Sequence, residues 1–333
     1  PTTPPTATPL PTDTPPPTPT PAPALRPLTA GGCCTQPFWS PDGERILFID
    51  QPPDGPLGIW GVEVGAAGAA PALFTERIAA YTSDLAFVVG PDPADRTVTL
   101  IERVADGATW RAPAGGRSVS ISPGRTRIAW SVSDESRSIE ARTAALWVAN
   151  LDGSDARLVA SLPRGGLSGW IDEETLLVST RASVQAREQA IAALRLADGA
   201  LVELARGERL RAGALSPDGA WFLYMVTFDP DPAANGLWLV RTDGSERRRL
   251  DESLFGSYRW RDARRLLIIP MRPAAEWHEL WELDVETGDA RRLTDPATAS
   301  FKVANGDWTV SPDGRHVAFV SSGDDNIWLL ELP

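Results

Sequence analysis

The sequence predicts an all-β protein: a seven-bladed β-propeller of four-stranded antiparallel blades, with an N-terminal strand that closes the ring inside the last blade. Two recurring patterns support this prediction. One is a Ser-Pro-Asp-Gly turn followed by an apolar strand. The other is a short strand, in most units marked by Trp, that returns every 41 to 47 residues. Four strands in a repeat of this length are typical of propeller blades.

The Ser-Pro-Asp-Gly turn opens a blade. It stands at 40–43, 216–219 and 311–314, and a shortened Ser-Pro-Gly form stands at 122–124. Pro presets φ at the second turn position, Asp can bond its local backbone, and Gly accepts a positive φ. Because β-branched and aromatic residues follow each turn, each unit is expected to begin with a hairpin.

The second pattern marks the third strand of each blade. A turn, in most cases Asp-Gly, and a fourth short strand follow it. Trp occupies the landmark position in five units, and Ile or Ala occupies it in two: Trp60, Ile101, Trp147, Ala193, Trp238, Trp281 and Trp328. The regular spacing of these Trp residues favours packing between blades over a role in binding a ligand.

The last unit stops at 332–333, directly after its third strand. The segment 25–30 begins Leu-Arg-Pro-Leu-Thr, which resembles the fourth-strand segment Ala-Arg-Arg-Leu-Thr at 290–294. We therefore predict that 25–30 supplies the missing outer strand, because closure leaves no blade incomplete. The propeller then spans 25–333.

Residues 1–24 form a separate segment with eleven Pro and eight Thr. Its only large apolar residue is Leu10, so it cannot bury enough surface to offset the entropy of ordering. We predict a disordered, extended tether. Such a tether suits a protein of the cell envelope, secreted or held at the cell surface or in the periplasm, with a signal or lipoprotein segment removed upstream.

The composition restricts the partners. A formal net charge of −12 argues against nucleic acid and against an anionic membrane surface. No apolar run is long enough to cross a membrane, so no membrane insertion by this chain is expected beyond a lipid anchor upstream. We expect a monomer.

The Ser-Pro-Asp-Gly hairpin, the downstream Ile/Leu-Trp strand and the terminal Leu-Thr together resemble the TolB-like family of WD-like β-propeller repeats. The resemblance covers about 25–333 and implies the propeller fold. Members of that family include periplasmic and surface scaffolds and the propeller domains of prolyl peptidases. Related pectin-fragment lyases use several His around a metal, a set that the two His of this chain cannot supply.

The two faces of the ring are expected to differ. Tight turns after the first and third strands share one face, and the long loops after the second strand share the other. Long loops on a rigid scaffold are the usual place for binding. Trp277, with His278 and Arg272 in the loop 270–279, is the first candidate. Neighbouring loops add basic residues that suit a carboxylate, although acidic neighbours offer mutual pairing as an alternative: Arg137, Arg142, Arg181 and Arg187.

Cys33 and Cys34 are the only cysteines, and they follow Gly31-Gly32 in the link into the first blade. In an exported protein they could form a vicinal disulfide, a strained ring that the glycines would ease. One interpretation is a rigid apolar plate at the channel mouth. The other is a locked turn, or two buried thiols.

Catalytic motifs are missing from the sequence. A lone loop His and the strand residue His316 do not build a nucleophile–base pair, and no GxSxG elbow, HExxH zinc motif or phosphate-binding glycine loop occurs. We therefore predict no cofactor and no metal site. The acidic loops 229–235 and 324–326 offer oxygen ligands for calcium but do not match the spacing of a calcium loop, so solvated loop tips are the preferred interpretation and calcium binding stays open. Paired carboxylates remain open, because 44 acidic residues allow many pairs.

The leading functional interpretation is a non-enzymatic extracytoplasmic scaffold that binds a protein or peptide through the long-loop face. The alternative is a glycan-acting hydrolase or lyase that uses carboxylates at the channel mouth.

Overall fold

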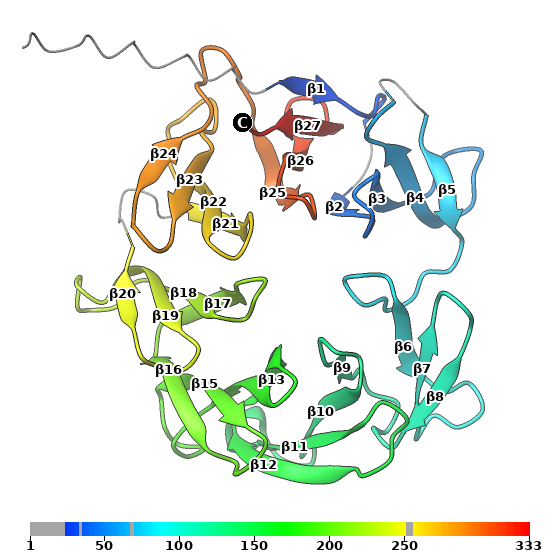
Figure 1. Ribbon diagram of the computed structural model, residues 1–333, viewed down its shortest axis with the longest axis vertical. Helices are drawn as coiled ribbons and strands as arrows, with labels where there is room; N and C mark the ends of the chain where they lie inside the picture. Colours follow the sequence, from blue (N-terminus) through cyan, green and yellow to red (C-terminus); the bar gives the residue numbers. More distant parts are fainter. Residues whose placement is uncertain (1–23, 33–34, 67–69, 251–255) are drawn as a thin grey trace, which may run out of the picture.

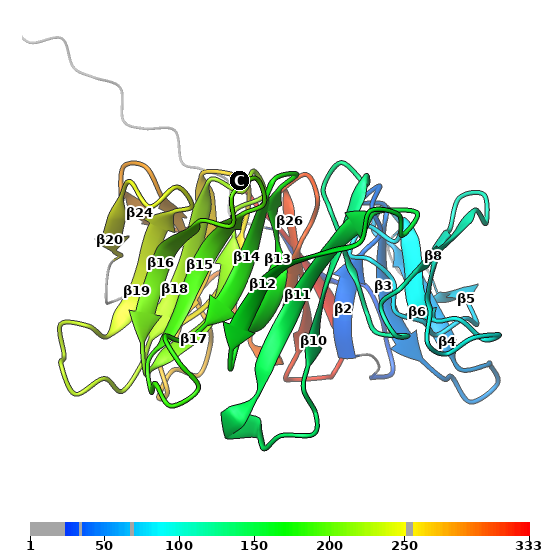
Figure 2. The ribbon, with the colours of Figure 1, turned by 90° about the horizontal axis from the view of Figure 1, so that it is seen from below.

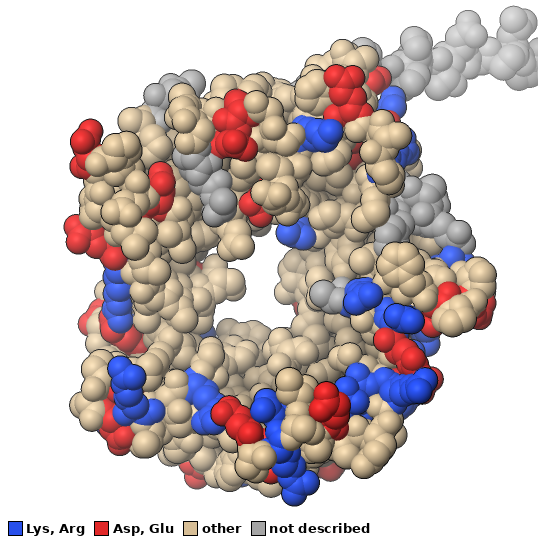
Figure 3. All heavy atoms as spheres, turned by 180° about the vertical axis from the view of Figure 1, so that it is seen from behind, with Lys and Arg blue, Asp and Glu red and all other residues tan. Residues whose placement is uncertain are grey.

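The computed structural model describes residues 24–32, 35–66, 70–250 and 256–333. They form seven antiparallel sheets around a central channel (Figure 1), and the space-filling view from behind shows that the channel is open (Figure 3). Six sheets have four strands and one has three. The predicted seven-bladed propeller is confirmed. The predicted tether 1–24 lies outside the described residues except for Ala24.

The blades follow one another along the chain. Blades 1 to 3 contain, in chain order, β2 (Thr35–Trp39), β3 (Arg45–Asp50), β4 (Gly58–Glu63), β5 (Ala72–Thr75); β6 (Phe87–Pro91), β7 (Thr99–Arg103), β8 (Thr109–Ala112); and β9 (Ser120–Ile121), β10 (Arg127–Ser133), β11 (Thr143–Asn150), β12 (Arg157–Pro163). Blades 4 and 5 contain β13 (Gly166–Asp172), β14 (Thr175–Thr180), β15 (Gln189–Arg195), β16 (Leu201–Gly207); and β17 (Leu210–Leu215), β18 (Trp221–Val226), β19 (Gly236–Arg241), β20 (Arg247–Arg249). Blades 6 and 7 contain β21 (Gly256–Trp260), β22 (Arg265–Pro270), β23 (Trp281–Asp284), β24 (Ala290–Arg292); and β25 (Val303–Val310), β26 (His316–Ser321), β27 (Ile327–Glu331), β1 (Leu25–Pro27).

The N-terminal strand closes the ring as predicted. β1 pairs antiparallel with β27, and Leu25 lies opposite Leu330. The pairing continues past β1, because the backbone N–H of Leu28 donates to the carbonyl of Ile327 (2.8 Å) and the N–H of Ile327 donates to the Thr29 hydroxyl (2.9 Å). Leu28 is buried in the cluster between blades 7 and 1.

The repeated Trp residues have a second role besides packing. All five are half-buried and lie against the clusters of apolar side chains between blades. In three of them the indole N–H also bonds the residue four positions earlier, at the end of the long loop: Trp60 to the Pro56 carbonyl, Trp238 to the Ala234 carbonyl, and Trp328 to the Asp324 carboxylate. The same side chain therefore packs a blade and anchors a loop.

The Ser of the Ser-Pro-Asp-Gly turn does more than its position in a turn suggests. In three blades its buried hydroxyl donates to the turn Asp and accepts the N–H of the residue five positions later. In blade 5 the Ser216 hydroxyl lies 2.5 Å from Asp218 Oδ1 and 2.9 Å from the Trp221 nitrogen. The hydroxyl thus satisfies the first backbone donor of the second strand.

Replacing Ser216 by Ala is expected to lower the free energy of unfolding by about 1–2 kcal/mol, because the buried Trp221 N–H loses this acceptor. Urea denaturation followed by Trp fluorescence would measure the change. Ser245→Ala, at an exposed outer turn, is the control and should change stability by less than about 0.5 kcal/mol. Equal stability of the two variants would contradict the role given to the turn hydroxyl.

The two faces of the ring differ as expected. The loops joining β10 to β11 and β18 to β19 extend from one face, on the lower side of Figure 2. The one helical element in the described part of the chain is the 3-10 turn Ile139–Ala141 in the first of these loops. Accordingly, no helix in that part is long or apolar enough to cross a membrane.

Candidate functional site

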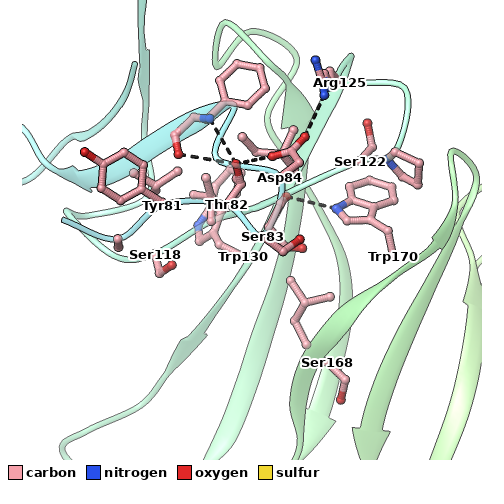
Figure 4. A pocket seen from close by; sticks show the side chains of 18 of the residues that line it. Tyr81, Thr82, Ser83, Asp84, Ser118, Ser122, Arg125, Trp130, Ser168 and Trp170 are labelled. Atoms are coloured by element: carbon pink, nitrogen blue, oxygen red, sulfur yellow. Dashed lines mark hydrogen bonds and ion pairs between the residues drawn. The ribbon is translucent and has the colours of Figure 1, made fainter. Parts of the chain in front are cut away.

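Blade 2 departs from the repeat and leaves an opening in the channel wall. Its sheet has three strands, and the place of the inner strand is taken by a single β-bridge between Tyr81 and Val88. A cavity of about 660 Å³ lies there, lined by residues of blade 2, of β9 and β10 in blade 3, and of β13 in blade 4 (Figure 4). We call it the Arg125 pocket, after the residue at its mouth.

The mouth of this pocket is built from two altered turns. Where blades 1, 5 and 7 place Gly in the Ser-Pro-Asp-Gly turn, blade 2 has Leu85 and blade 3 has Arg125, and both keep the positive φ of a glycine (54° and 59°). Side chains adopt this backbone conformation uncommonly, and where they do it is often at a functional site. Arg125 therefore places a guanidinium at a turn where blades 1, 5 and 7 have glycine.

Asp84 and Arg125 form an ion pair across the two blades. Arg125 Nη2 lies 2.7 Å from Asp84 Oδ2, and the guanidinium also lies over the ring of Phe87, 5.8 Å from its centroid. Burial alone would raise the pKa of Asp84. Hydrogen bonds from the Thr82 hydroxyl and the Ala86 N–H, together with Arg125, outweigh it and hold that pKa below its usual value. Asp84 is therefore ionised at neutral pH.

The walls combine hydroxyl groups with aromatic rings. Eight lining residues carry a hydroxyl: Tyr81, Thr82, Ser83, Ser118, Ser120, Ser122, Ser131 and Ser168. Figure 4 shows Trp130 and Trp170 beside them, and the Trp170 indole N–H donates to the Ser120 carbonyl (3.0 Å), which fixes the ring. Such walls can offer many hydrogen bonds and several flat apolar surfaces to one ligand.

The predicted loop candidates lie elsewhere in the ring. Trp277 is 40% exposed, and Arg272 is paired with Glu279 at 3.0 Å. His278 is half-buried: its ring meets Phe301 edge-on and its Nδ1 accepts the N–H of Val303. Burial, with a smaller contribution from Lys302, lowers the pKa of His278. Within the described residues, Arg272 and His278 are thus held by other side chains or by the backbone, whereas Trp277 forms no hydrogen bond or ring contact.

The four loop Arg residues lie two and three blades away from Trp277. Arg137 pairs with Asp134 (3.0 Å), Arg142 donates to the Arg137 carbonyl, and Arg181 donates to carbonyls of its own loop; Arg187 is exposed. These four Arg thus lie on neighbouring loops of blades 3 and 4. Most of their contacts are with groups of their own loops, as the alternative to ligand binding predicted. The role of these four Arg in binding stays a prediction.

The predicted vicinal disulfide cannot be compared with the structure, because Cys33 and Cys34 lie outside the described residues.

The residues of the Arg125 pocket were missed because tight turns were interpreted as purely structural. A signal was available. Blades 2 and 3 are neighbours, and equivalent turns of neighbouring blades lie side by side. A charged residue at the Gly position of one turn and an Asp in the next would therefore meet.

The chemistry of this site does not suit a metal ion. Among residues 24–32, 35–66, 70–250 and 256–333, no group of three or more His, Cys, Asp or Glu is arranged to hold one. The acidic side chain that lines the pocket, Asp84, already bonds Arg125.

No protein-family model matches the sequence, and no curated protein matches it. Solved structures do match. An oligogalacturonate lyase in complex with manganese has a TM-score of 0.60 and 13% identity, over 93% of each chain. An oligogalacturonate lyase from Vibrio parahaemolyticus has a TM-score of 0.57 and 12% identity, also over 93% of each chain. Dipeptidyl peptidase 4 from Porphyromonas gingivalis has a TM-score of 0.53 and 11% identity, over 87% of this chain and 50% of that chain.

At these identities the likeness establishes the fold. TolB from Acinetobacter baumannii also matches, with a TM-score of 0.41 and 16% identity over 74% of this chain and 63% of that chain. This value is too low to test the predicted membership of the TolB-like repeat family.

These neighbours correct the leading functional interpretation. A non-enzymatic scaffold binding a protein or peptide through its long loops is contradicted, because the whole ring is shared with lyases and in part with a peptidase. The prediction fails because the lack of catalytic sequence motifs does not exclude a site built between blades, and the channel wall holds such a polar pocket. The alternative, a glycan-acting enzyme, is better supported.

Proposed function

We propose that the protein is a glycan-acting lyase that binds an acidic oligosaccharide in the Arg125 pocket and cleaves it by β-elimination. The observation that carries the proposal is Arg125 itself. It is held at a positive φ beside Asp84, at the mouth of a cavity rich in hydroxyls and aromatic rings. The likeness to oligogalacturonate lyases over the whole ring supports the same class of substrate.

The pocket has the size and the lining for sugar residues. Its volume of about 660 Å³ falls within the rough range of 300–1,000 Å³ seen for small-molecule sites. Hydroxyl groups can donate to and accept from sugar hydroxyls, and aromatic rings can cover the apolar face of a sugar ring. The forked guanidinium of Arg125 suits a sugar carboxylate.

The electrostatics favour elimination over hydrolysis. Glycoside hydrolysis needs a pair of carboxyl groups, one of them protonated at working pH because its pKa is raised. The pKa of Asp84 is instead lowered, and so is that of Glu173, where burial is outweighed by hydrogen bonds from Thr126 and the Gly124 N–H. Neither carboxyl group is suited to be the general acid.

Elimination requires a base, a proton donor and a group that stabilises the sugar carboxylate. A base removes the proton from the carbon next to the sugar carboxylate, the electron pair forms a carbon–carbon double bond, and the bond to the departing glycosidic oxygen breaks as that oxygen gains a proton. Arg125 would hold the carboxylate as its charge grows. We assign proton transfer to Tyr81: its phenolate would take the proton from carbon, and the phenol so formed would give that proton to the departing oxygen. Its hydroxyl makes a long 3.4 Å hydrogen bond to the Arg77 carbonyl, which a substrate can replace.

The test is lyase activity of the full chain on oligogalacturonides, followed by the ultraviolet absorbance of the new double bond. Arg125→Ala is expected to lower kcat/KM about a hundredfold, the usual effect of removing one preorganised charge-stabilising group. Arg195→Ala is the matched control, since Arg195 forms a similar exposed pair with Asp198 (2.7 Å) on an outer turn of blade 4. It should retain full activity.

Two results would reject the proposal. Wild-type protein that binds oligogalacturonides without producing the double bond would exclude elimination. An equal loss in Arg125→Ala and Arg195→Ala would remove the Arg125 pocket from the mechanism.

We further propose that these repeats belong with the TolB-like family and that the enzyme works outside the cytoplasm, with 1–24 as its tether. The supporting observations are the repeated Ser-Pro-Asp-Gly and Ile/Leu-Trp patterns and the Pro/Thr composition of the N-terminal segment.

A further inference from the structure

A second pocket lies in the channel wall where blades 6, 7 and 1 meet. It has a volume of about 370 Å³ and is lined by Arg259 of β21, by Asp307, Trp308 and Thr309 of β25, and by Gln36 of β2. These strands lie across the channel from β9 and β13 (Figure 1). We call it the Arg259 pocket.

Irregular inner strands create this pocket. β2 shifts register between Thr35 and Phe38, and β25 shifts between Val303 and Trp308. Gln36 has a φ of 52°, a conformation that side chains rarely adopt. As at the Arg125 pocket, non-glycine residues at positive φ border the opening, and such strain is concentrated at ligand sites.

Arg259 is held in place, but no carboxylate of the described residues lies within 4.0 Å of its guanidinium to form an ion pair. Its guanidinium lies over Trp308, 5.2 Å from the ring centroid, and its Nη1 donates to the Tyr258 carbonyl (2.9 Å). The side chain is open to the channel, yet protein of three blades surrounds it, and this burial lowers the pKa of the guanidinium. Arg103, Arg195 and Arg265, by contrast, each pair with an Asp three residues away in the chain.

Asp307 sets a second condition on the ligand. Its carboxylate lies close enough to Arg259 to raise the pKa of the guanidinium, and its Oδ2 accepts a long hydrogen bond from the Gln36 N–H (3.4 Å). A carboxylate can only accept hydrogen bonds. It would repel a multiply charged anion without donors, and it would accept a hydroxyl next to a bound carboxylate.

We propose that the Arg259 pocket binds a small polyhydroxy carboxylate, with Arg259 holding the carboxylate and Asp307 accepting an adjacent hydroxyl. The Gln36 amide and the Thr309 hydroxyl supply neutral groups for further hydroxyls. This site does not depend on the reaction proposed for the Arg125 pocket, because it uses other residues on another part of the channel wall.

The test uses calorimetric titration of the full chain with gluconate, with sorbitol as the neutral polyol and with inorganic phosphate. Gluconate should bind, sorbitol should not, and phosphate should bind more weakly than gluconate. Arg259→Gln should weaken gluconate binding about tenfold or more, as expected for the loss of a charge-assisted pair. Arg195→Ala should leave gluconate binding unchanged.

A second variant separates the two roles and does not remove the Trp308 contact. Asp307→Asn should weaken gluconate binding while phosphate binding stays or improves, because the repulsion is gone. Gluconate affinity unchanged in both variants, or phosphate binding as tight as gluconate in the wild type, would overturn the proposal. Arg125→Ala distinguishes the two pockets, because this variant should retain gluconate binding even if it loses lyase activity. If gluconate binding were lost in Arg125→Ala and kept in the Arg259 and Asp307 variants, the proposal for the Arg259 pocket would be overturned.

Discussion

Replacing Arg261 by Ala is expected to lower the free energy of unfolding by about 3 kcal/mol, because the buried Glu282 carboxylate loses its buried partner and keeps only the exposed Arg291. Arg261 Nη1 lies 2.5 Å from Glu282 Oε2, and both side chains are less than a tenth exposed (7% and 6%). Its other donors reach the carbonyls of Gly314 (2.8 Å) and Pro333 (3.1 Å). One side chain thus joins the first turn of blade 6 to the first turn of blade 7 and to the C-terminus.

Chemical denaturation at neutral pH would measure the loss. Arg265→Ala is the matched control, because Arg265 forms an equally short but exposed pair with Asp262 on the same turn and should cost about 1 kcal/mol or less. Glu282→Gln provides a second variant, since it removes the charge that both Arg261 and Arg291 face. Similar stabilities of Arg261→Ala and Arg265→Ala would show that burial of the ion pair does not matter.

Removing residues 1–29 is expected to lower the melting temperature by at least about 10 °C, or to cause aggregation on heating. The truncation exposes the edge of β27 and takes Leu28 out of the cluster between blades 7 and 1. Loss of such a buried Leu costs about 2–5 kcal/mol even without the strand. The hydrogen bonds of Thr29 with Ile327 are lost as well.

A chain that lacks only 1–23 is the control for this experiment. It keeps β1 and the Ala24 carbonyl, which accepts the Glu331 N–H (2.9 Å), and it should melt with the full chain because the predicted tether contributes no packed surface. Differential scanning calorimetry of the three chains would decide. If the control melted as low as the longer truncation, the boundary between tether and propeller at 24–25 would be wrong.

The fold could be predicted because most blades repeat the same turn and strand pattern, which depends on residues close together in the sequence. The turn residues at Ser216-Pro217-Asp218-Gly219 specify a tight hairpin without help from distant parts of the chain. The last unit ends after its third strand, and the segment 25–29 resembles a fourth strand. Together they predicted that the N-terminal segment closes the ring, as β1 does. The inner strand of blade 2 was the exception, since nothing in its local pattern shows that pairing would shrink to the single bridge of Tyr81 with Val88.

The candidate site was harder to predict because it depends on contacts between blades. Asp84 and Arg125 are 41 residues apart and belong to units that look like diverged copies of the repeat. Their meeting follows from the geometry of the ring, which a local pattern does not describe. The loop residues attracted attention because loops usually bind, yet Arg272 and His278 are occupied by partners of the propeller itself.

The backbone of Arg125 has a consequence for how this protein balances stability against activity. Gly43, Gly219 and Gly314 adopt the same left-handed conformation freely, whereas a side chain there costs roughly 1–2 kcal/mol. A propeller optimised only to fold would have glycine at 125. Blade 3 therefore carries a local instability, and that instability keeps a positive charge fixed at the rim of the channel. Improving the fold at this turn would remove the group on which the proposed chemistry depends.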